Sequence, residues 1–204
     1  MRFRQATGAA LMAACLVGAA TASATSAAQP VAASSGATQL SAAAANSADA
    51  EFAMMMIPHH FQALVMSDLV IQGGSDAEVR QLAERIDLEQ DIEIDSMQAW
   101  QGWNGLEVTD AEEAYQDMLQ DPEMLHHMGM ATPAELADLD AAQGTAADVL
   151  FLQLMIRHHQ GAIDMIVDVL INGSDETVQQ MANDMGVTQD TQIQQMQEML
   201  DRLS

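Results

Sequence analysis

The chain has 204 residues and a formal net charge of −24, because 30 Asp and Glu residues are balanced by only six arginines and no lysine. Such an acidic protein is a poor partner for nucleic acids and anionic membrane surfaces, and a good partner for cations. Acidity also keeps an exported protein in solution, so the charge alone does not specify a function.

The N-terminal segment is typical of a secretory signal peptide. Arg2 and Arg4 precede an apolar run that ends in small residues, and we place the signal at residues 1–28. The run is too short to span a bilayer, and no later segment is long enough. We therefore expect an exported protein, periplasmic or extracellular, in which a flexible Ala-, Ser- and Thr-rich linker covers residues 29–47.

Cys15 is the only cysteine and lies within the predicted signal peptide. Anchoring as a lipoprotein through this cysteine is an alternative that the flanking "MAAC" supports poorly. The mature chain would contain no disulfide and no thiolate ligand, so soft-metal chemistry would have to use methionine and histidine.

The remainder of the chain, residues 48–204, reads as one domain that contains an internal duplication. With a constant offset of 99 residues and no gap, residues 49–98 align with residues 148–197, and roughly two positions in five are identical. We assign repeat one to residues 48–103, a connector to residues 104–145 and repeat two to residues 146–204.

Each repeat is predicted to be a pair of antiparallel helices. Apolar residues recur at helical spacing through residues 50–71 and 77–103, and again through 149–171 and 176–203. The "GGSDAE" turn offers glycine to end one helix, and Ser75 with Glu78 predicts a capping box for the next. Two such hairpins predict an all-α four-helix bundle with a pseudo-two-fold axis.

The long connector is expected to carry short helices of its own. One of them is predicted to begin at Thr132-Pro133, with Glu135 completing its first turn.

The residues kept between the two copies lie on one face of the first helix of each repeat. At 100° per residue, nearly all of them fall within an arc of about 120°, which should face the core. That face includes Asp49, His59 and His60, repeated as Asp148, His158 and His159. Apolar packing does not explain these polar groups, because buried polar side chains need partners.

The pattern M-x-x-H-H-x(5)-M, found once in each repeat, predicts metal binding. It contains Met56, His59, His60 and Met66, then Met155, His158, His159 and Met165. All six histidines of the chain occur as adjacent pairs, and the connector stretch "EMLHHMGM" adds the possible ligands His126, His127, Met128 and Met130. A single methionine on such a stripe would be read as core packing; the repeated combination favours a ligand set.

The donor types favour copper, as Cu(I), Cu(II) or both. Thioether and imidazole without thiolate select soft or borderline ions. Zinc would call for cysteine or carboxylate beside histidine. A di-iron bundle needs two Glu-x-x-His motifs, whereas this chain has one, Glu123 to His126, in the connector.

Gln90 is a polar residue on the apolar stripe of its helix and recurs as Gln189. It could hold a histidine ring by a hydrogen bond, or it could satisfy a nearby backbone group. Both interpretations remain open from the sequence.

The quoted residues resemble the family named domain of unknown function 305. The resemblance rests on Asp49, Phe52, "MIPHH", Met66, Gln90, Glu93-Ile94, Met97 and Trp100, and on "MGMATPAELADL" followed by "FLQLMIRHHQGAIDM". It covers nearly the whole mature chain and implies a ferritin-like four-helix bundle. It also implies that some exported members bind copper and contribute to copper tolerance.

The resemblance also extends the expected ligand set. It adds Met97 and Met196 from the second helix of each repeat to the motif residues above. Supporting hydrogen bonds are expected from Asp49, Gln90, Glu93, Asp148 and Gln189. One departure stands out: the carboxylate Glu93 of repeat one corresponds to Gln192 in repeat two, so the two sites should differ.

The sequence therefore predicts an exported copper-binding protein that buffers, sequesters or delivers the metal, possible partners being metal ions and a copper-delivery or export protein. No nucleophile, paired-carboxylate or phosphate-loop motif supports an enzyme. The alternatives are a metal-dependent redox enzyme in the same bundle and a metal-free helical interaction module.

Overall fold

The structure, a computed structural model, describes residues 44–204. This part of the chain contains four long helices, which are α1 (Ser47–Gly73), α2 (Ala77–Trp103), α6 (Thr145–Asn172) and α7 (Glu176–Leu203). It also contains three short helices, which are α3 (Ala111–Met118), α4 (Pro122–His127) and α5 (Pro133–Ala141). The predicted signal peptide, Cys15 and most of the predicted linker lie outside the described residues.

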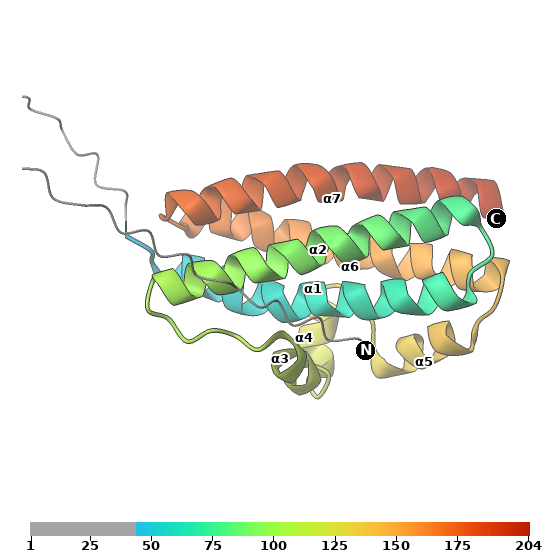
Figure 1. The fold of residues 1–204 in the computed structure, drawn as a ribbon, viewed down its shortest axis with the longest axis horizontal. Coiled ribbons are helices and arrows are strands. Elements are labelled where there is room, and N and C mark those ends of the chain that lie inside the picture. Colours follow the sequence, from blue (N-terminus) through green and yellow to red (C-terminus); the bar gives the residue numbers. More distant parts are fainter. Residues whose placement is uncertain (1–43) are drawn as a thin grey trace, which may run out of the picture. The chain divides into compact units, whose positions relative to one another are not determined.

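The four long helices form the predicted bundle of two hairpins. In each repeat the two helices pack side by side, α1 against α2 and α6 against α7, and the first helices of the repeats, α1 and α6, pack against each other (Figure 1). The all-α four-helix architecture expected from the repeat is therefore confirmed. Within residues 44–204, no helix has the combination of length and apolar composition that crossing a bilayer requires.

The turn inside each hairpin differs from the sequence prediction in how it caps the next helix. Asp76, not Ser75, is the N-cap of α2, and its carboxylate accepts hydrogen bonds from the backbone N–H groups of Glu78 and Val79 at 3.0 and 3.1 Å. The predicted Ser75–Glu78 capping box is wrong, because the Ser75 hydroxyl donates to Asp148 instead. Asp175 caps α7 in the same way as Asp76 caps α2.

Two buried aspartates tie the hairpins together at opposite ends of the bundle. Asp49 on α1 accepts hydrogen bonds from the backbone N–H groups of Ser174 and Asp175, at the start of α7. Asp148 on α6 accepts the equivalent bonds from Ser75 and Asp76, at the start of α2. Each hairpin thus supplies the carboxylate that satisfies the turn of the other hairpin.

The repeated glycine of the turn allows this contact. Gly74 has a φ of −73°, so it is not there to adopt a left-handed conformation. A Cβ at Gly74 would collide with the Asp148 carboxylate, and one at Gly173 would collide with that of Asp49. The "GSD" turn of each repeat therefore binds the aspartate of the other repeat.

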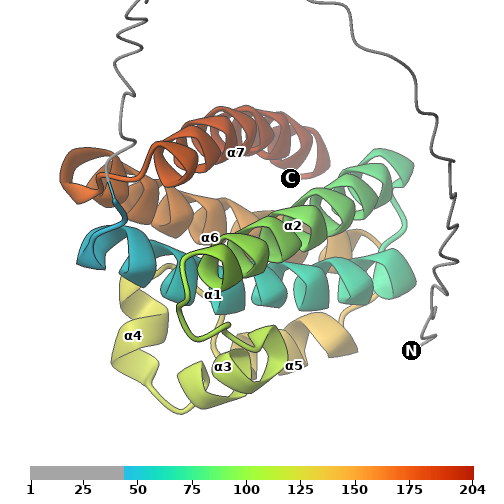
Figure 2. The same cartoon turned by 60° about the vertical axis from the view of Figure 1, so that its left-hand side comes forward.

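The connector carries α3, α4 and α5 along the α1–α6 side of the bundle (Figure 2). The predicted start of α5 is confirmed: the Thr132 side chain accepts from the Glu135 N–H, and the Glu135 carboxylate accepts from the Thr132 N–H. This reciprocal pair is the capping box that the sequence indicates at this point.

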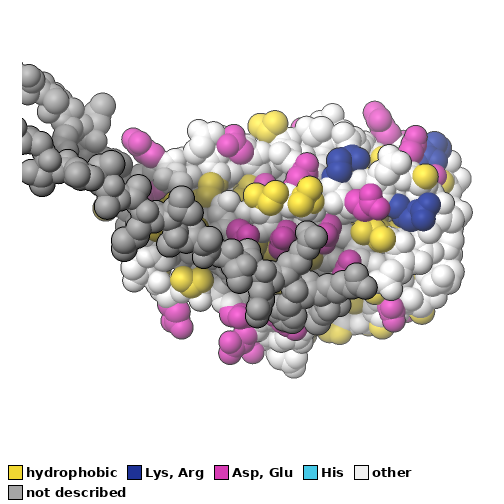
Figure 3. Space-filling view, viewed as in Figure 1, with side chains coloured by type: hydrophobic (Ala, Val, Ile, Leu, Met, Phe, Trp, Pro, Cys, Tyr) yellow, Lys and Arg dark blue, Asp and Glu magenta, His cyan; other side chains and the backbone are white. Residues whose placement is uncertain are grey.

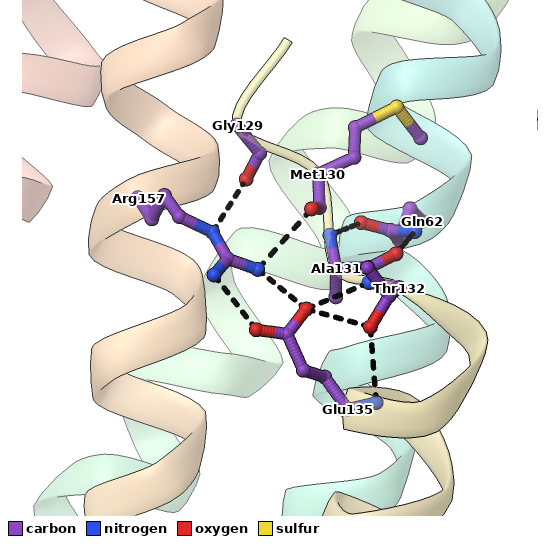
Figure 4. Close-up of polar contacts among 7 residues, drawn as sticks. All are labelled: Gln62, Gly129, Met130, Ala131, Thr132, Glu135 and Arg157. Carbon is purple, nitrogen blue, oxygen red and sulfur yellow. Dashed lines mark hydrogen bonds and ion pairs between the residues drawn. The ribbon is translucent and has the colours of Figure 1, made fainter. Parts of the chain in front are cut away.

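Two bundle residues hold the connector in place before α5 (Figure 4). Arg157 on α6 donates to the carbonyls of Gly129 and Met130, both at 3.2 Å, and pairs with the Glu135 carboxylate at 2.7 Å. The Gln62 side chain on α1 accepts a hydrogen bond from the Ala131 N–H and donates one to the Ala131 carbonyl. The repeat equivalents of Arg157 and Gln62 are Pro58 and Gly161, so this anchoring is not duplicated.

The interior of the four-helix bundle contains two apolar clusters, which are separated by a layer of polar side chains. One cluster contains Met56, Met97 and Met185, and the other contains Met66, Met155 and Met196. Along each long helix the polar residues lie between the segments that supply the two clusters. This layer contains seven buried residues, and we call it the central polar layer. They are His59, His60, Gln90, His158, His159, Gln189 and Gln192.

The surface is strongly acidic. Figure 3 shows Asp and Glu side chains spread over one face, with the few arginines near the end of the bundle that holds the C-terminus of α7. Arg202 pairs there with Asp76 at 2.7 Å and with Glu78 at 2.9 Å.

Candidate metal centre

Four histidines occupy the middle of the bundle, and each is fully buried. His59 and His60 come from α1, and His158 and His159 come from α6. The His59 and His158 rings stack with their centroids 3.7 Å apart and their planes at 28°. His60 lies 6.2 Å from His59, and His159 lies 6.1 Å from His158, again between ring centroids. The structure therefore brings both predicted pairs into one cluster.

Every one of these imidazoles uses its Nε2 atom in a hydrogen bond to an oxygen. His59 bonds the Met128 carbonyl at 3.1 Å, and His158 bonds the His59 carbonyl at 2.9 Å. His60 bonds the Glu93 carboxylate at 2.8 Å. Carbonyl and carboxylate oxygens can only accept, so the hydrogen of each neutral ring resides on Nε2.

His159 follows the same rule through an oriented amide. Its Nε2 lies 2.7 Å from the side-chain oxygen of Gln192. The amide nitrogen of Gln192 donates to the Glu89 carboxylate at 2.6 Å, which fixes the oxygen toward the histidine. His159 therefore also carries its hydrogen on Nε2.

In the neutral form of each ring, the Nδ1 atom therefore carries a free lone pair. All four Nδ1 atoms are buried, and none has a hydrogen-bond partner within residues 44–204. Leaving a buried acceptor unpaired costs about 1–3 kcal/mol. A ring that donates through one nitrogen and offers the other as a lone pair is in the state that binds a metal ion.

The electrostatics keep three of the rings neutral, those of His59, His158 and His159. Burial lowers the pKa of His59 and His158 well below the usual value, and the neighbouring imidazoles lower both pKa values further. Burial also lowers the pKa of His159 to about 4, although the hydrogen bond to Gln192 opposes that change. Neutral imidazole is the form that binds a metal ion, so these three rings are competent at neutral pH.

The predicted methionine ligands divide into two groups. Met56 and Met97 lie in one apolar cluster, whereas Met66 lies in the other with Met155 and Met196. Met56 and Met66 are ten residues apart, which is about 15 Å along a helix. The two methionines of one motif therefore lie in different apolar clusters, and their role as ligands stays a prediction.

Met165, the repeat equivalent of Met66, has a different environment. Met66 is fully buried, whereas Met165 is half-buried and lines a surface pocket. In the connector, His126 and His127 are exposed, and Met128 and Met130 are buried in a third cluster under α4. The connector side chains therefore do not join the central polar layer.

Of the residues expected to hold the ligands by hydrogen bonds, only Glu93 bonds a histidine. Asp49 and Asp148 instead bind the helix starts described above, about 15 Å along the helix from the histidines. Gln90 and Gln189 are buried, but neither amide has a hydrogen-bond partner in the described part of the chain. Neither of the two interpretations of Gln90 describes this arrangement.

The offset of 99 residues pairs Gln192 with Glu93, and Gln192 repeats the histidine contact of Glu93 with a neutral amide. The sequence did not indicate Glu89, which orients the Gln192 amide. Nothing in the sequence indicated the backbone contact of Met128, which depends on the path of the connector.

The donor set is suited to a mixed site. In residues 44–204, no three side chains from His, Cys, Asp and Glu converge to hold an ion by themselves. Thioether sulfur would have to complete the coordination. Met56 and Met155 each lie one helical turn before a histidine pair.

The comparisons with known proteins agree with this fold. Residues 49–200 match the family described as Domain of unknown function (DUF305). No curated protein matches the sequence. Among solved structures, a DUF305 fragment from Deinococcus radiodurans is 32% identical with a TM-score of 0.69, over 78% of this chain and 99% of the other.

Two further structures are informative. A DUF305 protein from Streptomyces coelicolor, described as a candidate secreted protein, is 32% identical with a TM-score of 0.66, over 76% of this chain and 92% of the other. CopM in its Cu(II)-bound form is 30% identical with a TM-score of 0.64, over 76% of this chain and 97% of the other. CopM has also been solved in Cu(I)-bound and Ag-bound forms. The chain belongs to the DUF305 family.

Proposed function

We propose that this protein is an exported copper-binding protein that buffers, sequesters or delivers the metal. The observation that carries the proposal is the set of four buried imidazoles, each anchored through Nε2 and each presenting an unpartnered Nδ1 lone pair. A bound ion would satisfy these otherwise unpaired acceptors.

The chemistry of the layer favours copper over other metals. The available donors are neutral nitrogen from imidazole and soft sulfur from thioether, which copper accepts and magnesium or calcium does not. The layer is fully buried, and burying an ion costs more as its charge rises. A singly charged ion, Cu(I), is therefore the form that the interior accommodates best. The binding of copper by CopM supports the same assignment.

The two histidine pairs should bind unequally. His60 donates to the Glu93 carboxylate, whereas His159 donates to the neutral Gln192 amide. A carboxylate acceptor makes an imidazole more basic and a stronger ligand. We expect the pair in repeat one to bind more tightly.

A binding role is favoured over catalysis because the rings are fully buried. All four histidines have no solvent-exposed surface, which leaves no space for a substrate beside an ion. Export is supported by the N-terminal sequence, with Arg2 and Arg4 before an apolar run.

Titration of the mature, untagged protein with Cu(I) against a competing chelator tests the proposal. The central variant is His59→Ala/His60→Ala, and the control is His126→Ala, an exposed histidine on the connector that belongs to neither proposed site. The central variant should lose bound copper and the control should not. Circular dichroism checks that the central variant remains helical. Equal copper binding by wild type and a folded central variant would refute the proposal.

A further inference from the structure

A methionine-rich pocket of about 630 Å³ opens on the surface between α1, α4 and α6. Figure 2 shows α4 beneath the first turns of α1. Four methionines are among its lining residues, namely Met55, Met124, Met128 and Met165. The exposed His127 lies on the same lining, so imidazole nitrogen is available beside the sulfur atoms.

The pocket is also electrostatically suited to cations. Glu51, Asp164 and Asp168 are among its lining residues, and all three are exposed. No arginine lines it. Carboxylates at the edge of a pocket raise the local concentration of positive ions.

The internal repeat supplies a comparison that argues against simple packing. The positions equivalent to Glu51 and Met55 are Leu150 and Leu154, and those equivalent to Asp164 and Asp168 are Val65 and Leu69. On that equivalent face, Leu154 is buried in one apolar cluster with Leu139 of α5, and Leu69 packs against the cluster.

The same helical face is thus apolar where α5 covers it and bears thioether and carboxylate where it forms the pocket. Met55, Met124 and Met165 are half-buried, so part of each residue is exposed to solvent. The fold alone requires only apolar groups at these positions, and leucine would meet that requirement.

The pocket is separate from the central polar layer, although one residue contacts both. Met128 is one of the residues that line the pocket, while its carbonyl accepts the hydrogen bond from His59. The Met128 backbone crosses α6 at Gly161, where a Cβ would collide with the Met128 carbonyl. The position of this methionine is therefore set by the bundle.

We propose that this pocket is a second metal site, which binds a soft monovalent cation such as Cu(I) or Ag(I) through thioether sulfur and the His127 imidazole. Soft sulfur donors select such ions over hard cations. The site faces solvent and uses none of the four buried histidines. Metal binding in this pocket therefore does not depend on metal binding in the central polar layer.

The first test is silver binding, measured by native mass spectrometry on the mature protein titrated with silver nitrate. The pocket variant is Met55→Leu/Met124→Leu/Met165→Leu. The control variant is Met54→Leu/Met181→Leu/Met199→Leu, which changes three methionines that do not line the pocket. Methionine-to-leucine exchange preserves volume, so both variants should fold. The pocket variant should bind one Ag(I) ion fewer than wild type, and the control should bind the same number. An unchanged number in the pocket variant would overturn the proposal.

The second test locates the ion by methyl NMR of methionine in the wild-type protein. Addition of Ag(I) should shift the methyl signals of Met55, Met124 and Met165. Shifts confined to Met56, Met97, Met155 and Met196 would overturn the pocket site while supporting the central one. Shifts confined to the pocket methionines would support the pocket site and would show that no central methionine binds silver. No shift at any methionine would overturn the pocket site, whereas the histidine-based central site is tested by the Cu(I) titration above.

Discussion

The His59 and His158 rings stack face to face at 3.7 Å, and the Nε2 atom of His158 donates to the backbone carbonyl of His59 at 2.9 Å. These residues are equivalent positions of the two repeats, so the stack lies where the pseudo-two-fold axis passes between α1 and α6. An ion bound by one histidine pair must therefore move or polarise the other pair. The two halves of the centre are expected to bind metal with coupled affinities.

The metal-free protein should lose stability as the pH falls from 6.5 toward 4. In the folded state the pKa of His159 is about 4, against an ordinary value of 6.5. Above pH 6.5 the ring is neutral in both states and contributes nothing. Between these pH values the ring is protonated in the unfolded chain but stays neutral in the folded one. The free energy of unfolding therefore falls, by on the order of 3 kcal/mol at pH 4 for this residue.

Urea unfolding of the metal-free protein at a series of pH values measures this effect. His59 and His158, whose pKa values are also lowered, should add to the loss. The carboxylates of Asp76 and Glu135 have pKa values of about 2 and should contribute mainly at still lower pH. A free energy of unfolding that stays constant from pH 7 to 5 would contradict buried neutral histidines.

Exchanging the acceptors of His60 and His159 should shift affinity between the two halves. Glu93→Gln removes the carboxylate from His60, and Gln192→Glu adds one beside His159. Loss of such a supporting carboxylate typically costs 10- to 100-fold in metal affinity, so Glu93→Gln should weaken the tighter Cu(I) step by about that factor.

Competition titration of Cu(I) measures both variants. Asp95→Asn is the control, since Asp95 is an exposed carboxylate on the same helix. If Glu93→Gln and Asp95→Asn bind copper alike, Glu93 has no influence on the ligand. Gln192→Glu also places a second carboxylate against Glu89, so its stability must be measured separately.

Removing either buried aspartate should destabilise the bundle without changing metal binding. Asp49→Ala leaves the N–H groups of Ser174 and Asp175 unsatisfied, and Asp148→Ala does the same to Ser75 and Asp76. Hydrogen bonds to a charged group contribute about 1.5–3 kcal/mol each, so the loss of two such bonds should cost about 3–6 kcal/mol in each variant. Chemical unfolding gives the stability, and copper titration at low denaturant should give unchanged stoichiometry. A variant that loses copper but keeps full stability would show that its aspartate contributes to the metal centre.

Leucine at Met97 or Met196 should separate packing from ligation. Both methionines are fully buried, one in each apolar cluster. The exchange preserves volume and should cost under about 1.5 kcal/mol of stability. Cu(I) affinity should nevertheless fall, because a thioether donor is removed. Unchanged affinity in both variants would assign these residues to packing alone.

The sequence predicted the fold well because the duplication itself carries the information. A repeat with helical spacing and a short turn has few ways to bury its apolar stripe, and the four long helices begin and end close to the predicted residues. The burial of His59, His60, His158 and His159 followed from the same periodicity.

The parts of the site that the sequence did not predict depend on contacts between distant segments. Periodicity places Met56 and Met66 on one face but does not show that an axial separation of about 15 Å puts them in different clusters. Asp49 lies on the inward face and is expected near the histidines, yet it accepts a hydrogen bond from Ser174 at the end of the bundle. The Met128 carbonyl reaches His59 only because Arg157 and Gln62 hold the connector, and no local pattern encodes that path.

The reciprocal aspartate contacts bear on how such a chain can arise. A single hairpin contains both the carboxylate and the Gly-Ser-Asp turn that receives it, so two identical hairpins could complete each other as a homodimer. Joining them in one polypeptide removes the requirement for identity. Pro58 opposite Arg157, and Gln62 opposite Gly161, are differences that only the fused form can hold. Within one polypeptide, two related hairpins can thus differ on one flank while the shared interior stays paired.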